Sequence, residues 1–365
     1  MYSQLLLAPN AFKGTLSAPE ICRILQEELS GGHYPVISIP LGDGGDGTAE
    51  ILASYFNARQ VNTQAEDALG VMHPVTYYTT SGIAIIELAT ICGLKYLRPE
   101  EYDVENANTA GVGRVINEIV NRGIKEIILC IGGSASIDGG TGALQAMGLK
   151  IVKHASRFNN HILDIKEIET DKLIENFKEI SFTILCDVEN PLLGSQGAAH
   201  IFGPQKGASG LQISILERQM KVYARLLEKI TGKDVTTVKH GGAAGGIAAA
   251  FSALLNARLV SGADYCIDLS GFKKLLNTST LVITGEGKLD NQSLSGKIPG
   301  TVARLCRSAQ ADAIAIAGIA EDIPGIFKEI FSLSHYAGST ATSLLQPEFF
   351  LRMAARDLKK LYLTF

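Results

Sequence analysis

Hydrophobic positions follow one plan at both ends of the chain: a short apolar run, a turn of small polar residues, and then a helical pattern. QLLLAP (4–9) precedes a segment in which apolar residues from Ile21 to Leu29 recur on one helical face. Ser17 and Glu20 have the spacing of a capping box and predict where this helix begins. Further apolar runs of this kind lie at 36–40, 281–287, 313–318 and 329–334.

The pattern changes near residue 60, where QVNTQAED, HPVTYYTT and IAIIELAT predict strands without helices between them. Helical patterns return at 108–123 and 211–230, and apolar strands at 125–133 and 182–188.

Alternation of strands and helices at both ends predicts a Rossmann/flavodoxin-like, doubly wound parallel sheet of class α/β. We expect this discontinuous domain to comprise residues 1–65 and 261–365, and an inserted α/β domain to comprise residues 66–260. Inserted domains usually leave a cleft against their host, and ligands bind in clefts, so we expect the site there.

Composition narrows the possible partners. The 365 residues are 46% hydrophobic and 19% charged, with a formal net charge of −4 and no run of basic residues. Nucleic acid is therefore not an expected partner, because phosphate backbones are bound by clustered Lys and Arg. The start of the sequence has no signal-peptide pattern, and 243–257 is too short to span a bilayer, so no membrane partner is expected. Six scattered cysteines without a CxxC pair indicate reduced thiols and a cytoplasmic protein.

Glycine-rich loops that carry charged residues follow several of the predicted strands. Glycines let backbone N–H groups approach a phosphate, and carboxylates beside them can hold Mg²⁺. Each loop also has a purely structural reading. GDGGDG could be a tight connection in which Asp46 caps the next helix, and Asp138 could cap the helix after its own loop. The loops are PNAFKGT (9–15), GDGGDGT (42–48), GGSASIDGGTG (132–142), CDVENPLLG (186–194) and TGEGKLDNQSLSGK (284–297).

Several standard motifs are missing from these loops. The chain has no GxxxxGK[ST], no GxGxxG after its first strand and no GxSxG, and glycines replace two ligands of an EF-hand pattern in GDGGDG. What remains is either a polyphosphate–Mg²⁺ site of non-Walker type or a protein that binds an anionic ligand.

Five motifs, in order along nearly the whole chain, resemble those of the bacterial type I glycerate kinase family. They are APNAFKGTLSA (8–18), PLGDGGDGT (40–48), GGSASIDGGTGALQAMG (132–148), the segment from CDVENPLLG to GPQKGA (186–208), and LVITGEGKLDNQSLSGKIP (281–299). The resemblance implies transfer of the γ-phosphoryl group of MgATP to D-glycerate, at the 2-hydroxyl, to give 2-phosphoglycerate. It also implies ATP as co-substrate and Mg²⁺ as cofactor.

Four positions depart from the family's pattern. Asn10 and Ala11 stand where its first motif has Asp and Ser. Ile137 stands where its third motif has Asn, and Asp46 where its second motif has Glu. If the family's Asp binds metal or acts as a base, Asn10 retains at most a neutral contact, whereas Asp46 keeps a carboxylate.

Motif position and chemistry together give the candidate site residues. Asp187 is the preferred base for the hydroxyl proton, with Asp43 as its substitute, and Lys13 is the third catalytic candidate. The candidate Mg²⁺ ligands are Asp43, Asp187 and Glu286. Candidate contacts to phosphate or substrate are Lys206, Lys297, Ser134, Gly285, Gly287, Gly44 and Gly45.

Two other functions use the same loops. One is a kinase that forms 3-phosphoglycerate or acts on another short hydroxy acid. The other is a non-catalytic sensor of a hydroxy acid or nucleotide, which would show no ATP turnover.

Overall fold

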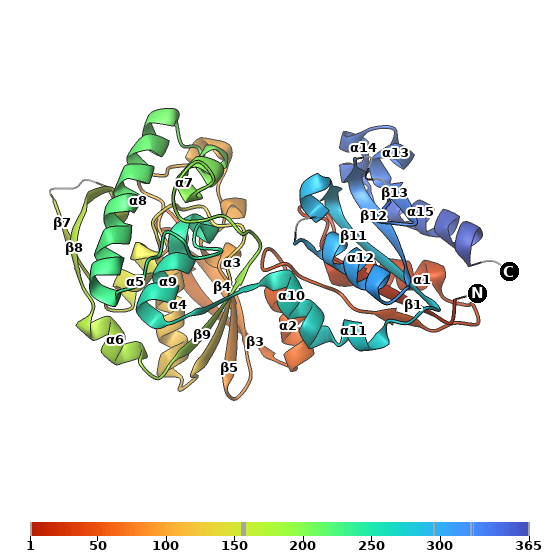
Figure 1. Cartoon of the computed structure of the whole chain (residues 1–365), viewed down its shortest axis with the longest axis horizontal. Helices are drawn as coiled ribbons and strands as arrows, with labels where there is room; N and C mark the ends of the chain where they lie inside the picture. Colours follow the sequence, from red (N-terminus) through yellow and green to blue (C-terminus); the bar gives the residue numbers. More distant parts are fainter. Residues whose placement is uncertain (1, 155–157, 295, 322, 324, 364–365) are drawn as a thin grey trace. The chain divides into compact units, whose positions relative to one another are not determined.

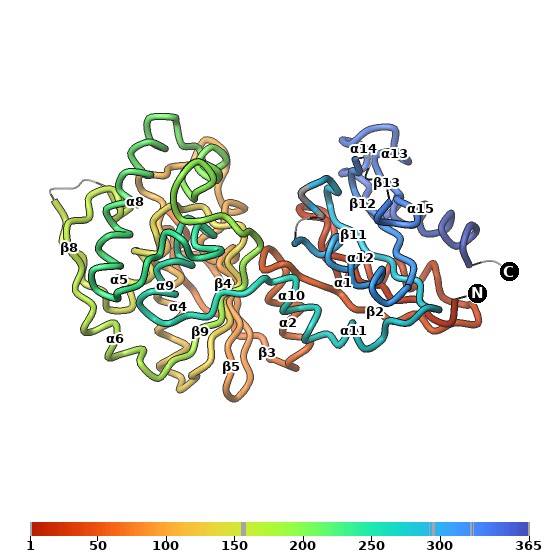
Figure 2. The backbone as a smooth tube through the Cα atoms, in the orientation of Figure 1, coloured from red at the N-terminus to blue at the C-terminus, as the bar shows by residue number. Residues whose placement is uncertain are grey.

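The chain folds into two compact units of class α/β. The computed structural model describes residues 2–154, 158–294, 296–321, 323 and 325–363. Unit 1 consists of Met1–Asp43 and Gly262–Phe365, and unit 2 consists of Gly44–Ser261. In Figure 1 unit 1 therefore carries the red and blue ends of the colour scale, and unit 2 carries the orange to green middle. Figure 2 traces the backbone, along which the chain passes from unit 1 to unit 2 and later returns to unit 1.

Unit 1 is built on a parallel sheet with the strand order β13-β12-β11-β1-β2. β1 lies between β2 and β11, so its neighbours come from opposite ends of the chain. The chain continues from β1 to β2 on one side of β1, and the later strands β11, β12 and β13 lie on its other side. The β1/β11 border is therefore the switch point of this doubly wound sheet. The strands are β1 (Gln4–Pro9), β2 (Val36–Ser38), β11 (Thr280–Leu289), β12 (Asp312–Ala320) and β13 (Glu329–Ser332).

Helices cover both faces of this sheet, as Figure 1 shows. On one face α1 and α15 pack against alternate strand residues such as Leu5 and Leu281. α1 begins with the predicted capping box of Ser17 and Glu20. α12 contacts β1, β11 and β12. The helices are α1 (Ala18–Leu29), α10 (Gly262–Ser270), α11 (Phe272–Leu275), α12 (Ile298–Ser308), α13 (Leu333–Ala337), α14 (Thr340–Leu345) and α15 (Pro347–Tyr362).

Unit 2 has a mixed sheet with the strand order β10-β9-β6-β5-β4-β3. β10, β9, β6 and β5 run parallel, and β4 and β3 form an antiparallel edge. The parallel strands are nearly continuous apolar runs because helices bury them. The strands are β3 (Arg59–Glu66), β4 (Met72–Thr79), β5 (Ile83–Glu87), β6 (Glu126–Cys130), β9 (Ser181–Cys186) and β10 (Arg258–Ser261), with a separate hairpin of β7 (Lys150–Lys153) and β8 (Ile165–Glu169).

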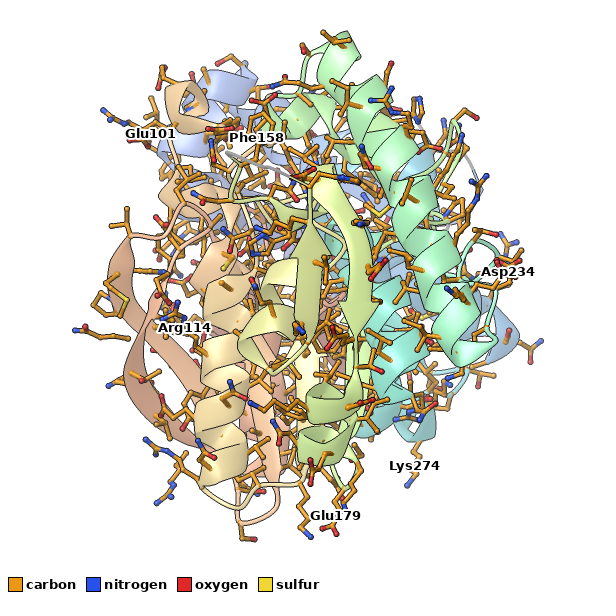
Figure 3. All side chains as sticks on the ribbon, turned by 90° about the vertical axis from the view of Figure 1, so that its left-hand side faces the viewer. Glu101, Arg114, Phe158, Glu179, Asp234 and Lys274 are labelled. Carbon is orange, nitrogen blue, oxygen red and sulfur yellow. The ribbon has the colours of Figure 1, made fainter. Side chains whose placement is uncertain are left out.

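Helices of unit 2 pack around a large hydrophobic core. α8 is the longest and ends at Gly232, which has the left-handed φ of 70° that ends helices. Exposed charged side chains such as Arg114, Glu179 and Asp234 point outward in Figure 3. The helices are α2 (Thr48–Phe56), α3 (Ala89–Cys92), α4 (Ala110–Asn121), α5 (Thr141–Ala146), α6 (Asp171–Phe177), α7 (Ala198–Phe202), α8 (Gly210–Thr231) and α9 (Ile247–Leu255), and a 3₁₀ turn, η4 (Pro204–Lys206), follows α7.

The boundary between the units differs from the sequence-based boundary near residue 65. α2 and β3 belong to unit 2, because α2 contacts β4 and β5 and β3 pairs along its whole length with β4. The chain therefore crosses between Asp43 and Gly44, inside the GDGGDG loop itself. Among the described residues, no helix is both long enough and apolar enough to cross a membrane.

Candidate functional site

A cavity of about 270 Å³ opens in unit 1 at the carboxyl end of the sheet. β1 pairs with β11 only as far as Gly285, while β11 continues to Leu289 beside β12. The loop after β1 turns away there, so the cavity lies at the switch point, where ligands of such sheets bind. Lys13, Asp43, Glu286, Gly287 and Lys297 all line it, and the structure thus brings these predicted residues together.

The two carboxylates of this cavity are both buried. Asp43 is 5% exposed, and its Oδ2 accepts a hydrogen bond of 2.9 Å from Nδ2 of Asn10. Glu286 is 6% exposed, and its buried Oε1 has no hydrogen-bond partner among the described residues. Burial raises the pKa of Glu286, and Asp43 adds to this effect while Ser293 and Lys297 oppose it. A buried carboxylate oxygen without a hydrogen-bond partner, on a residue that lines a cavity, is a group that a bound cation would satisfy.

The cavity residues of unit 1 fit a Mg²⁺ ion that is bound jointly by protein carboxylates and by the phosphate oxygens of a ligand. Mg²⁺ is commonly bound by one or two carboxylates, with waters and phosphate oxygens completing its coordination. Within the described ranges there is no group of three or more His, Cys, Asp or Glu residues that could hold a metal. Asp43 and Glu286 are two carboxylates that line this cavity, and the third predicted ligand, Asp187, belongs to unit 2.

Two predicted glycines of unit 1 have different surroundings. Gly287 lines the cavity, and a Cβ there would lie 3.2 Å from the backbone nitrogen of Lys13. Gly285 lies inside the sheet, where a Cβ would come within 1.8 Å of the carbonyl oxygen of Ile316. Glycine at 285 is therefore required by strand packing, irrespective of any phosphate.

A smaller cavity of about 70 Å³ in unit 2 is lined by Ser134, Asp187 and Lys206. Lys206 is 2% exposed, and its Nζ donates hydrogen bonds of 2.7 Å to Ser134 Oγ and to the Ser136 carbonyl oxygen. Burial lowers the pKa of Lys206 to about 7, although Asp138 and Asp187 oppose this shift. The lysine thus lies close to the midpoint of its titration at neutral pH, and a bound anion would favour its charged form.

Asp138 lies near this cavity and caps the start of α5, which is the structural role considered for it in the sequence analysis. Its buried carboxylate accepts hydrogen bonds from the backbone N–H groups of Gly140 and Gly142 at the start of α5. It also accepts bonds from the N–H and hydroxyl groups of Thr109, at the start of α4. These contacts make Asp138 a structural residue that joins two helix starts.

Residues 44–47 of the GDGGDG loop pack against neighbouring loops of unit 2. Gly44 has φ +96°, and its carbonyl oxygen accepts a 2.9 Å hydrogen bond from Gly132. A Cβ on Gly132 would come within 2.6 Å of the Cα of Gly45. Close backbone contact accounts for these glycines, and neither Gly44 nor Gly45 lines the two cavities described above.

Asp46 does not cap α2, whose start has no side-chain cap. Its carboxylate lies 3.1 Å from Nζ of Lys95, which is 3.6 Å from Glu87. Glu87 is 3% exposed and accepts a 3.3 Å hydrogen bond from the N–H group of Ala49 in α2. Burial raises the pKa of Glu87 to about 7, with Lys95 opposing and Asp46 adding to the shift.

Glu87 was not among the candidate residues selected from the sequence. It could have been found because a carboxylate ends the apolar run IAIIE, just as Asp187 follows the apolar strand β9.

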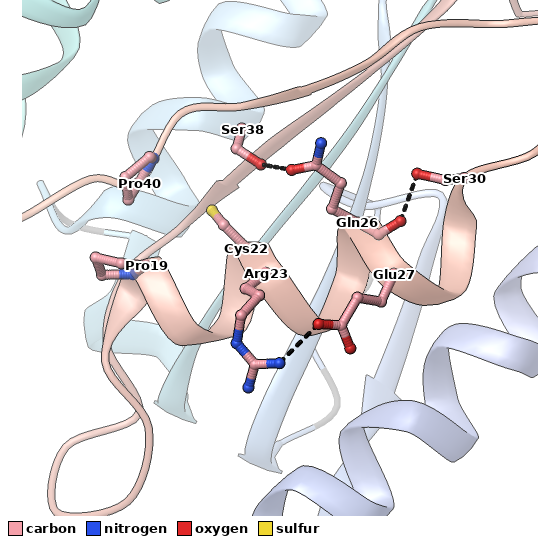
Figure 4. Close-up of a pocket in the computed structure, with 8 residues that line it drawn as sticks. All are labelled: Pro19, Cys22, Arg23, Gln26, Glu27, Ser30, Ser38 and Pro40. Atoms are coloured by element: carbon pink, nitrogen blue, oxygen red, sulfur yellow. Dashed lines mark hydrogen bonds and ion pairs between the residues drawn. The ribbon is translucent and has the colours of Figure 1, made fainter.

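A larger hollow of about 510 Å³ lies on α1 and β2, and Figure 4 shows its lining. Its polar side chains already pair with one another: Arg23 contacts Glu27 at 2.7 Å, and Ser38 donates to Gln26 at 3.0 Å. Because it offers no orphaned buried group among the residues that line it, it is a weaker candidate than the cavity of Glu286.

The departures from the family's pattern have separate explanations. The uncharged amide of Asn10 donates a hydrogen bond to Asp43, which is the neutral contact expected for it. Ile137 is fully buried in the core of unit 2 and carries no site chemistry. Two histidines outside the cavities have protein contacts: His240 Nδ1 lies 2.6 Å from the Val188 carbonyl oxygen, and His200 Nδ1 lies 3.6 Å from Glu217.

Comparisons with known proteins show which family the chain resembles over nearly its whole length. A sequence model described as the glycerate kinase family matches residues 5–363. A glycerate kinase of Halalkalibacterium halodurans is 31% identical, over 97% of each chain. Glycerate 2-kinase of Escherichia coli K12 is 34% identical, over 88% of this chain and 87% of its own. The crystal structure of a protein assigned as glycerate kinase 2 from Salmonella typhimurium LT2 superposes with a TM-score of 0.80 at 29% identity, covering 99% of this chain and 98% of that one.

Proposed function

Since the chain belongs to the glycerate kinase family, we propose that it transfers the γ-phosphoryl group of MgATP to the 2-hydroxyl of D-glycerate. The observation that carries this proposal is the unit 1 cavity, which combines lysines with two buried carboxylates, one of them holding an orphaned oxygen. The name glycerate 2-kinase of the Escherichia coli relative supports the 2-hydroxyl as acceptor.

The unit 1 cavity suits the nucleotide's phosphates. Lys13 and Lys297 supply positive charge, and Lys297 also stands at the N-terminal cap position of α12, whose first N–H groups favour anions. Asp43 and Glu286 would hold Mg²⁺, which neutralises charge on phosphate oxygens when it is bound. Asn10 keeps Asp43 in place without adding a negative charge.

The unit 2 cavity suits a small hydroxy acid. At about 70 Å³ it is too small for a nucleotide, and Lys206 is a buried cation that can pair with a carboxylate. Ser134 fixes the position of the Lys206 amine. Asp187, half-buried in the same cavity, is the proposed base.

In the proposed step Asp187 accepts the proton of the 2-hydroxyl while that oxygen forms a bond to the γ-phosphorus. The bond between the γ-phosphorus and its bridging oxygen breaks, and ADP leaves with the bonding electrons. Protein groups contribute alignment and charge neutralisation in such transfers, because the transition state needs little covalent assistance.

The direct test is incubation with MgATP and a panel of hydroxy acids, with products identified by ³¹P NMR. The proposal predicts ADP and 2-phosphoglycerate from D-glycerate. Formation of 3-phosphoglycerate, or preference for another hydroxy acid, would change the assigned acceptor. Absence of ADP with every acid, from protein that binds nucleotide, would instead support the non-catalytic sensor.

A further inference from the structure

The cavity of unit 1 has both charged and apolar side chains in its lining. The lysines and carboxylates described above supply charge together with Lys288, whereas Phe12, Ile319 and Leu344 bring apolar side chains to the same cavity. Leu344 is 54% exposed and Ile319 is half-buried. A single exposed leucine needs no explanation on a protein surface, but one that lines a cation-rich cavity gives that cavity both a charged and an apolar part.

Local structure fixes the position of Leu344. α14 begins at Ser339, whose Oγ accepts a 3.1 Å hydrogen bond from the N–H group of Thr342. The next residue, Ser343, is buried and donates a 2.8 Å hydrogen bond to the Thr340 carbonyl. Leu344 follows in the last turn of this helix, which contacts β12.

Backbone packing also fixes Ile319. It pairs with Lys288 in the β11/β12 register, directly after Gly318. A Cβ on Gly318 would lie 2.6 Å from the carbonyl oxygen of Gly287, so glycine at 318 lets the two strands keep this close contact. Glu286 of the charged lining and Ile319 of the apolar lining therefore lie on adjoining strands, while Leu344 comes from α14.

A nucleotide has the matching division, with charged phosphates at one end and the flat apolar faces of a base at the other. We propose that Leu344 and Ile319 form the contact surface for the nucleobase of the phosphoryl donor. This inference rests on the proposed function, because it takes a nucleoside triphosphate as the donor. It adds a base-recognition element that none of the glycine-rich motifs contains.

The test separates contacts to the base from contacts to the phosphates. ADP carries a base and inorganic diphosphate does not, so calorimetric titration with each ligand, both with Mg²⁺, distinguishes the two parts of the cavity. Leu344→Ala should weaken ADP binding about 5- to 10-fold, from the apolar area that a base would cover, and leave diphosphate binding unchanged. Ile319→Ala should act in the same direction.

Leu345→Ala is the matched control, because Leu345 is the adjoining leucine, is 81% exposed and lies outside the lining of the cavity. It should leave both affinities unchanged. Unchanged ADP affinity in Leu344→Ala, or equal weakening of ADP and diphosphate, would overturn the inference.

Failure of this inference can be told apart from failure of the proposed function. If wild-type protein phosphorylates glycerate but Leu344→Ala and Ile319→Ala bind ADP normally, only the base contact is wrong. If wild-type protein neither binds ADP nor forms it from MgATP and glycerate, both proposals fall.

Discussion

The two cavities use the same residue type under opposite conditions. In unit 1 Lys13 is exposed and Lys297 half-buried, whereas in unit 2 Lys206 is 2% exposed and bonded to protein oxygens. An exposed ammonium stays charged at neutral pH and suits a mobile polyphosphate. Burial lowers the pKa of Lys206, a bound anion favours its charged form, and its fixed position suits a small ligand. Burial, more than residue identity, decides what each lysine can do.

The largest expected effect comes from removing the proposed base in unit 2. Asp187→Asn should lower kcat about 100- to 10,000-fold, because the amide cannot accept the hydroxyl proton. A coupled ATP assay measures this change, and the melting temperature checks that the fold is kept. Glu189→Gln is the matched control, because Glu189 is 61% exposed and pairs with Lys239 on the surface. Near-normal turnover in Asp187→Asn would remove Asp187 from the mechanism.

The buried lysine provides the second comparison. Lys206→Met keeps the length of the side chain but removes its charge, and it should raise KM for glycerate about 10- to 100-fold while leaving KM for ATP nearly unchanged. Lys221→Met, at an exposed lysine of α8, serves as the control. Equal rises in both KM values would show that Lys206 supports the fold of unit 2 without selecting the acid.

The pH dependence of acid binding sharpens the same comparison. The pKa of Lys206 is lowered to about 7, so its charge is lost as pH rises through that value. Glycerate stays anionic throughout this range. We therefore expect kcat/KM for glycerate to fall as pH rises above about 7, toward a tenfold loss per pH unit if only the charged lysine binds. Lys206→Met should lack this dependence, and an identical profile in the variant would assign the titration to another group.

The smallest expected effect is at the exposed lysine of unit 1. Lys13→Ala should raise KM for ATP about 3- to 10-fold, because a solvated charge contributes less than a buried one. Lys274→Ala, on α11 and outside the cavity lining, controls for loss of one positive charge. If KM for both ATP and glycerate is unchanged in Lys13→Ala, Lys13 is structural.

Local pattern was sufficient for much of this fold. Apolar runs located β1, β11 and β12, and Ser17 with Glu20 located the start of α1. A parallel sheet built from both chain ends was expected from the alternation of strands and helices, and the parallel pairing of β1 with β11 confirms it.

The local sequence pattern did not predict features that depend on packing between segments far apart in the chain. Nothing in the sequence near Thr48 indicates that α2 packs on β4 and β5, so the boundary expected near residue 65 differs from the division into units. The orphaned oxygen of Glu286 and the depressed pKa of Lys206 are products of burial, which spacing along a chain does not reveal. The contact of Leu344 with the cavity likewise depends on where α14 packs.

The position of β1 between β2 and β11 has a consequence during synthesis. Residues 10–279, which include all of unit 2, are made between β1 and β11, so the ribosome adds about 270 residues before this second partner of β1 appears. At about 5–20 residues per second, that delay is on the order of 15–55 s. Leu5, Leu6 and Leu7, all fully buried in the finished protein, therefore wait without one of their two flanking strands while unit 2 can already fold. The nascent chain is most vulnerable to aggregation in this interval, and a chaperone that shields its first strand would act then.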